Sequence, residues 1–193
     1  IRDMVAYLLN HPESSLVYGD ADYIGIDSEM ISAYDTCDWS FEKLKERCFI
    51  CQPATMWRKR TIEEFGYFDE SLHYIMDYEY WLRIANNVGV ISYLPKKLAN
   101  SRLYENTKTM SCRGKVFDEV FAVTGEMFGE TSYQWYKAYA LYTATVKLAD
   151  FKLTPGSVAT KVVGGAILLL LLPRIVYTRL RNNVKHVGYL MRS

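Results

Sequence analysis

Strand-like runs separated by helical runs constrain the fold of the first 112 residues more than any other feature of the sequence. Residues 1–10 repeat apolar side chains at helical spacing, and His11-Pro12 ends that pattern. The strand-like runs begin at residues 16, 49 and 90. Strands that alternate with helices along a chain are typical of α/β folds. We therefore predict an α/β domain over residues 1–112.

The same patterns predict where regular structure is interrupted. Gly19 breaks the regularity of the first strand, and Pro95 interrupts the third, at residues 90–104. The second strand is expected over residues 49–57, which are rich in β-formers up to Trp57 and carry no charge. Residues 28–47 are polar and irregular apart from a short helical run near their end. A further short helix follows the second strand and ends at Gly66.

One acid stands within an apolar and aromatic run at residues 73–85, HYIMDYEYWLRIA. This acid, Asp77, opens a helical pattern that closes near Gly89. The apolar stripe of that pattern consists of Tyr80, Trp81, Ile84 and Val88. The residues alone leave two compatible interpretations open. Asp77 caps the helix, a role worth about 1 kcal/mol, or it performs chemistry in a cleft.

Residues 113–193 have a helical character and form a predicted second region. Helical runs cover residues 115–128 and 132–151, and Thr154-Pro155-Gly156 separates them from an apolar run at residues 162–172. As a helix, that apolar run spans roughly 16 Å, against about 30 Å of hydrocarbon in a bilayer. We therefore predict a helical extension whose apolar run is too short for a full membrane span.

The end of the chain is basic, although the net charge of the whole chain is only +1. No Asp or Glu follows residue 150. Seven basic residues do: Lys152, Lys161, Arg174, Arg179, Arg181, Lys185 and Arg192. Residues 174–192 form a basic amphipathic helical pattern, which suits the interface of an anionic bilayer. We predict contact with an anionic membrane surface through residues 162–192 and no nucleic-acid partner. The alternative is a helix packed on the body with its charges in water.

Four cysteines favour reduced thiols in a cytosolic protein over a disulfide framework. Cys48 and Cys51 form a C-x-x-C within the run RCFICQPATMW, which has the pattern of a strand. Side chains three positions apart on a strand point to opposite faces, so we expect no shared zinc ion.

Several segments in order resemble the second half of a family 2 glycosyltransferase. They are VYGDADYIGID, FICQPATMWRKRTIEEFGYFDESLHYIMDYEYWLRIA and LPKKLANSRLYENTKTMS, all within residues 1–112. The resemblance implies a partial A-type glycosyltransferase fold that lacks the N-terminal nucleotide-binding half and is followed by C-terminal helices. Residues 1–112 would be the acceptor side of the catalytic domain. Residues 113–193 would be a helical extension with a basic, membrane-associating tail.

The resemblance also implies a divalent cation, Mg or Mn, whose ligands lie mostly outside this chain. The family's acidic metal motif precedes a helix, and here that helix is residues 1–10, so the motif is expected upstream of Ile1. Asp20-Ala21-Asp22 imitates the motif, but the resemblance places Asp20 and Asp22 beside the sugar or acceptor pocket. For Asp22 and Asp27, the alternative is that they are acids in a turn at a strand end that satisfy backbone N–H groups. The start at Ile1 leads us to expect a piece of a larger protein.

Asp77 matches the position of the family's general base. An acceptor hydroxyl attacks an anomeric carbon poorly unless a carboxylate removes its proton as the new bond forms. Aromatic neighbours such as Tyr74, Tyr78 and Trp81 are expected to stack on sugar faces and to raise the pKa of the base by excluding water. Arg83 is expected either to steady the Asp77 loop or to pair with phosphate, with an ordinary helix-face arginine as the alternative.

Other matching positions complete the predicted site. The acceptor pocket is expected to be lined by Gln52, Trp57, Arg58, Trp81 and Arg83. Arg102 and Lys108 lie in a segment that in relatives folds over the diphosphate of the donor, where cations stabilise the leaving charge. Tyr104 stands where many relatives place a metal-binding His.

These positions predict an inverting glycosyltransferase that uses a nucleotide-sugar donor and a lipid-linked or polysaccharide acceptor. We expect it to serve polysaccharide biosynthesis of the cell envelope, on the cytoplasmic face of the cell membrane. Residues 1–193 are not expected to be active without the donor half. The alternative is a non-catalytic, membrane-associated interaction module that lacks a donor site.

Overall fold

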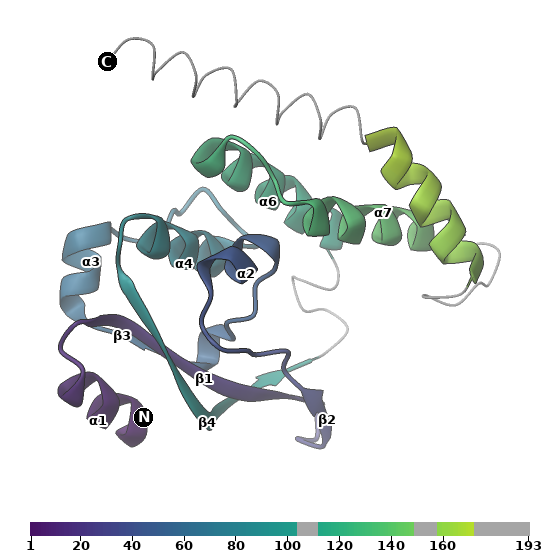
Figure 1. The fold of residues 1–193 in the computed structure, drawn as a ribbon. Helices are drawn as coiled ribbons and strands as arrows, with labels where there is room; N and C mark the ends of the chain where they lie inside the picture. The colour runs from purple at the N-terminus through teal and green to yellow at the C-terminus, as the bar shows by residue number, and fades with distance from the viewer. Residues whose placement is uncertain (104–111, 149–157, 172–193) are drawn as a thin grey trace, which may run out of the picture. The chain divides into compact units, whose positions relative to one another are not determined.

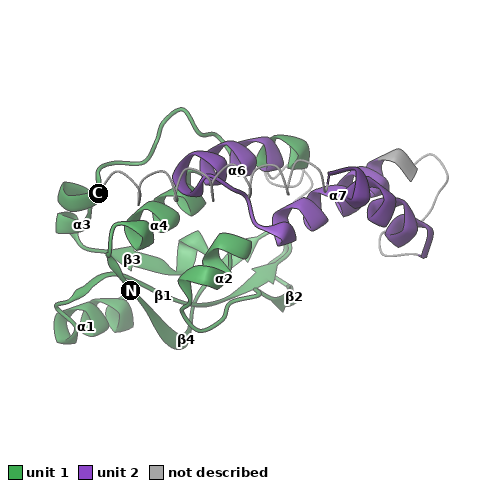
Figure 2. Cartoon of the chain, turned by 45° about the horizontal axis from the view of Figure 1, so that its top comes forward, with its two compact units in different colours: residues 1–116 green, residues 117–193 purple. Residues whose placement is uncertain are grey.

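The computed structural model describes residues 1–103, 112–148 and 158–171. The chain divides into two compact units, residues 1–116 and residues 117–193 (Figures 1 and 2). The first unit combines a four-stranded mixed sheet with helices. This arrangement confirms the α/β class predicted from the alternating patterns.

Strand β1, Ser14–Ile24, pairs with each of the other strands of the sheet. β4, Val90–Arg102, runs parallel to it along its whole length. β3, Thr55–Trp57, pairs antiparallel with the first half of β1, and β2, Met30–Ala33, pairs antiparallel with the second half. β1 is almost entirely buried, and its apolar residues Leu16, Val17 and Tyr18 are fully so.

Both predicted interruptions occur at one irregularity in the β1–β4 ladder. Gly19 pairs with Leu94 and Asp20 pairs with Lys97, so Pro95 and Lys96 bulge out of the register. A Cβ on Gly19 would lie 2.7 Å from the carbonyl oxygen of Lys96. Glycine is therefore required here because the two backbones approach too closely for a side chain.

Helices cover the two faces of the sheet (Figure 1). α1, Arg2–Asn10, buries Met4 and Leu8 against Val17 on one face. The next residue along β1, Tyr18, points to the other face, where its ring contacts Phe49 at 5.9 Å between centroids. α2, Phe41–Glu46, and α4, Met76–Asn86, lie on that second face. The Tyr78 hydroxyl joins these two helices by donating to the carbonyl oxygen of Leu44 at 2.6 Å.

α3, Lys59–Phe65, ends at Gly66 with a φ of 81°, as the sequence predicted. α4 also ends in a left-handed residue, but here that residue is Val88, with a φ of 64°. The Gly89 N–H then donates to the Ile84 carbonyl at 2.8 Å, which closes the helix. Val88 is 89% exposed. The expectation that it belongs to the apolar stripe was wrong, because the helix ends before it.

The prediction of one strand over residues 49–57 was wrong for most of that run. A 3-10 helix, η1, occupies Gln52–Ala54, and only Thr55–Trp57 form a strand. Pro53 lacks the N–H that a strand ladder needs, which favours a turn. Cys48 and Cys51 both lie in the irregular segment between α2 and η1, so the argument that they point to opposite faces of a strand fails. β2 was missed because its side chains are exposed and show no alternation.

In the second unit, α6, Arg113–Phe128, begins within the first unit and continues into the second. α7, Tyr133–Leu148, follows, and a further helix covers residues 158–171. Phe117 of α6 contacts the ring of Trp135 of α7 with 6.2 Å between centroids. The joint at 154–156 and the basic run at 174–192 lie outside the described residues. Among the described helices, none combines the length and apolar character that crossing a membrane requires.

Candidate active site

Asp77 is the second residue of α4, in the first turn of the helix. Its Oδ1 accepts the backbone N–H of Tyr78 at 2.8 Å. The N-cap residue is Ile75, so Asp77 supports the first turn without being the cap itself. Among the described residues, no cationic side chain pairs with this carboxylate, and no side chain forms a hydrogen bond with it. The side chain is thus fixed in direction while its negative charge has no cationic partner there.

Burial raises the pKa of Asp77 above the ordinary value for an aspartate. The N–H groups of Tyr78 and of Asp77 itself act in the opposite direction, but burial has the larger effect. Raised pKa values are typical of carboxylates that accept protons in catalysis.

Three neutral side chains lie close enough to Asp77 for its charge to affect their pKa values: Tyr34, Cys48 and Cys51. The charge of Asp77 contributes to the raised pKa of each of them, and burial is the main cause in each. The pKa of Cys51 rises to about 11, and those of Cys48 and Tyr34 rise further, so all three are uncharged at neutral pH. We call these three residues and Asp77 the Asp77 cluster.

The Asp77 cluster lies toward the carboxyl end of the parallel strand pair. Tyr34 follows β2, and its N–H donates to the carbonyl of Ala21 in the second half of β1 at 2.9 Å. The Tyr34 ring packs against a core of Ala21, Cys51 and Ala54. A second phenol, Tyr23, lies 4.9 Å from Tyr34 between ring centroids. The carboxyl ends of parallel strands are where open α/β sheets bind ligands.

Sequence reasoning missed Tyr34. It lies in the run expected to be polar and irregular, and nothing in its sequence surroundings separates it from the other tyrosines. The nearby C-x-x-C was interpreted as a pair of reduced thiols without a shared zinc ion, and it gave no indication of Tyr34.

Asp20 and Asp22 have partners of their own. Asp20 Oδ1 accepts the hydroxyl of Tyr93 at 2.7 Å, and burial together with this hydrogen bond raises the pKa of Tyr93 to about 12. Asp22 is buried and forms an ion pair with Lys97. Because a cation already neutralises Asp22, the two acids do not fit a divalent-metal motif. Within the described part of the chain, no three or more His, Cys, Asp and Glu side chains gather closely enough to hold a metal.

The predicted acceptor residues differ in exposure: Gln52 is exposed, Trp81 is buried, and the others are intermediate. Gln52 is exposed and directly follows Cys51, so it lies at the margin of the Asp77 cluster. Trp57 contacts the ring of Trp81 edge-on at 5.7 Å, and Trp81 is fully buried. Tyr78 is also buried, at 2% exposure. The expectation that Trp81 and Tyr78 stack on sugar faces is therefore corrected: both rings belong to the core.

Arg58 is engaged with the backbone at the end of α1. Its guanidinium donates to the carbonyl of Ser14 at 2.9 Å, to that of His11 at 3.0 Å and to that of Leu8. The bonds to Leu8 and His11 satisfy carbonyls at the end of α1, and the bond to Ser14 reaches the first residue of β1. The contacts give Arg58 a structural role, and its expected binding role stays a prediction.

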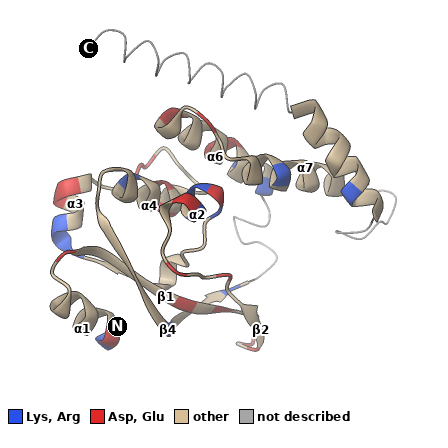
Figure 3. Cartoon of the chain, in the orientation of Figure 1, with Lys and Arg blue, Asp and Glu red and all other residues tan. Residues whose placement is uncertain are grey.

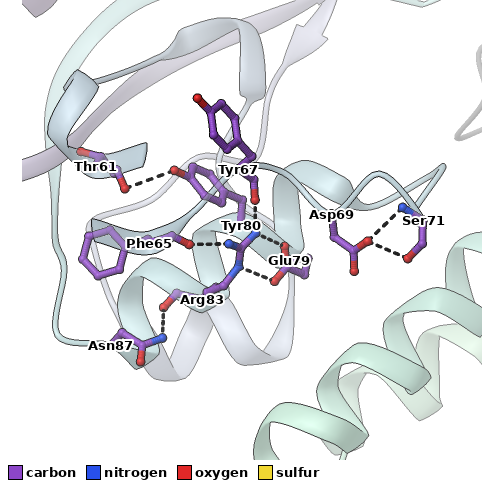
Figure 4. A network of polar contacts seen from close by, with 9 residues as sticks. All are labelled: Thr61, Phe65, Tyr67, Asp69, Ser71, Glu79, Tyr80, Arg83 and Asn87. Carbon is purple, nitrogen blue, oxygen red and sulfur yellow. Dashed lines mark hydrogen bonds and ion pairs between the residues drawn. The ribbon is translucent and has the colours of Figure 1, made fainter. Parts of the chain in front are cut away.

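Arg83 ties α4 to the segment after α3 (Figure 4). It forms a two-pronged ion pair with the buried Glu79 at 2.8 and 2.9 Å. It also donates to the carbonyls of Phe65 and Tyr67, the latter at 2.8 Å. These contacts give Arg83 a structural role between α4 and the end of α3. The expected roles in steadying the Asp77 loop or pairing with phosphate stay predictions.

Arg102 holds the turn that follows β1. It donates to the carbonyls of Gly25 and Ile26, both at 2.6 Å, and to the hydroxyl of Ser28 at 3.0 Å. Its expected contact with a diphosphate stays a prediction. Lys108, the other expected diphosphate ligand, lies outside the described residues, as does Tyr104.

No family model matches the chain, and no curated protein matches it significantly.

Proposed function

We propose that the protein is an inverting glycosyltransferase that moves a sugar from a nucleotide-diphosphate donor to a hydroxyl of a lipid-linked or polysaccharide acceptor. Asp77 is the general base. The observation that carries this proposal is a fixed, half-buried carboxylate with a raised pKa among uncharged neighbours.

The chemistry needs one base. Asp77 takes the proton of the acceptor hydroxyl while the hydroxyl oxygen bonds to the anomeric carbon of the donor sugar. The bond from that carbon to the diphosphate breaks on the opposite side, and its electron pair leaves with the diphosphate oxygen. A raised pKa makes Asp77 a better proton acceptor than an exposed aspartate, provided that it is ionised at the working pH.

The proposal extends to a partial A-type glycosyltransferase fold in residues 1–112. The parallel β1–β4 pair, the position of the Asp77 cluster toward its carboxyl end and the sequence resemblance support it. In this proposal the donor half and any divalent cation are supplied by chain outside residues 1–193. Gln52, exposed beside the Asp77 cluster, is the acceptor contact that the geometry favours.

The test is sugar transfer by the complete polypeptide that carries residues 1–193, with a panel of nucleotide sugars and a membrane-extract acceptor. Asp77→Asn keeps the size of the side chain and its bond to the Tyr78 N–H but cannot take a proton. We expect the turnover to fall by about 10²–10⁴-fold, the usual contribution of a general base. Donor binding, measured by calorimetry, should change little.

Asp69→Asn is the matched control. Asp69 lies in the loop before α4, and its carboxylate accepts the N–H and hydroxyl of Ser71 at 2.9 and 2.6 Å. The same chemical change there should leave turnover near that of the native protein. Near-normal turnover in Asp77→Asn would refute the base assignment. Absence of transfer by the native polypeptide with every donor would instead favour a non-catalytic, membrane-associated module.

A further inference from the structure

The helix at residues 158–171 packs on α7 through small residues. A Cβ on Gly164 would lie 2.9 Å from Leu141 Cδ2 and 3.6 Å from the carbonyl oxygen of Ala140. Ala140 is itself buried at 1% exposure. Thr160, one helical turn before Gly164, is buried on the same side of the helix. This close approach determines which side of the helix is turned toward α7.

The opposite side of this helix is exposed and apolar. The exposed fractions are 78% for Val158, 65% for Val162, 66% for Leu169 and 78% for Leu170. Gly165 and Ala166 lie between them and are also exposed. Lys161, at the margin of this face, is the one charged residue in residues 158–171 (Figure 3).

We call Val158, Val162, Leu169 and Leu170 the apolar face. A helix exposed to water normally carries polar residues on its outer side, so this face requires a cover.

The charge of the surrounding sequence indicates which cover fits. From residue 151 to the end, the chain carries seven Lys and Arg residues and no Asp or Glu. The apolar surface of a partner protein would explain the apolar face alone. An anionic bilayer explains both features, because its acyl chains cover apolar side chains and its headgroups attract Lys and Arg. We propose that the apolar face of residues 158–171 docks on the surface of an anionic membrane.

This inference does not rest on the proposed reaction, because it concerns residues in the second unit and needs no turnover. The experiment is co-sedimentation of the full chain with vesicles of phosphatidylcholine, alone or mixed with phosphatidylglycerol. We expect binding to the mixed vesicles that weakens as salt is raised. The triple variant Val162→Ser, Leu169→Ser and Leu170→Ser should lower the partition coefficient about tenfold or more, because three large apolar contacts are lost.

The matched control places the same kind of change on the first unit. Val5 and Leu9 of α1 are exposed apolar residues, at 41% and 73%, outside the apolar face. Val5→Ser with Leu9→Ser should bind vesicles as the native chain does, and circular dichroism checks that each variant keeps its helices. Native binding by the triple variant would overturn the proposal. So would a native chain that ignores the vesicles and forms a dimer that the triple variant abolishes, since a second copy would then cover the face.

Discussion

At the scale of single residues, the burial that suits Asp77 to accept a proton also lowers the stability of the fold at neutral pH. Burial raises its pKa in the folded chain above its ordinary value of 3.8. The stability that such a group contributes is present below its unfolded pKa and is lost as pH rises through its folded pKa. At neutral pH the ionised carboxylate therefore destabilises the fold relative to a neutral side chain of the same shape.

We accordingly predict that Asp77→Asn raises the free energy of unfolding at neutral pH, measured by urea denaturation. The gain should shrink as pH falls toward the ordinary Asp range, where the native carboxylate is also neutral. Asp69→Asn should show the opposite sign, because hydrogen bonds from Ser71 lower the pKa of Asp69. If Asp77→Asn loses stability at neutral pH, Asp77 is a structural helix-start residue and not a strained base.

At the scale of elements, the position of α4 depends on Arg83. Its guanidinium joins Glu79 within the helix to the carbonyls of Phe65, the last residue of α3, and of Tyr67, which follows α3. Glu79 is only 6% exposed, so removal of Arg83 leaves a buried carboxylate without this partner. Breaking a buried pair in this way costs roughly 3–5 kcal/mol.

We predict that Arg83→Ala lowers the free energy of unfolding by about 3 kcal/mol. The double variant Glu79→Ala with Arg83→Ala should recover part of this loss, because no buried charge is then left unpaired. Chemical denaturation of the native chain, the single variants and the double variant measures the coupling. A loss in Arg83→Ala below about 1 kcal/mol, the range of exposed pairs, would show that Arg83 does not secure α4.

Elements with a strong local signal could be predicted from sequence, and those decided by tertiary contacts could not. The helical spacing of residues 1–10 and the glycine after α3 determined α1 and the end of α3. Residues 49–57 look like a strand because they are apolar and uncharged, but Pro53 turns the chain and only Thr55–Trp57 reach β1. β2 forms because its backbone pairs with β1. Its side chains are all exposed, so they show no alternating pattern that would predict a strand.

The candidate site shows the same limit. The sequence predicted Asp77 at the start of a helix, and the structure places it there. Tyr34 reaches the site only because β2 returns the chain beside Ala21, a contact that no local pattern specifies. Trp81 looked like a binding residue because aromatic rings suit both cores and clefts, and only its complete burial distinguishes the two.

At the scale of the whole molecule, the two proposals belong to different units. The Asp77 cluster lies in the first unit, and the apolar face of residues 158–171 lies in the second. A lipid-linked acceptor is held at a membrane. If the acceptor is of this kind, both units would act at the same membrane surface. The vesicle experiment and the transfer experiment nevertheless fail or succeed separately, because each depends on residues of one unit.

The pH dependence of kcat/KM for sugar transfer by the complete polypeptide tests the central claim most directly. A general base must be ionised, so the rate should fall on the acid side in a one-proton step. The midpoint should lie above 3.8, because burial raises the pKa of Asp77. The residual activity of Asp77→Asn should lack that step. An acid step of unchanged midpoint in Asp77→Asn, or a native rate that stays constant down to the ordinary Asp range, would contradict the account.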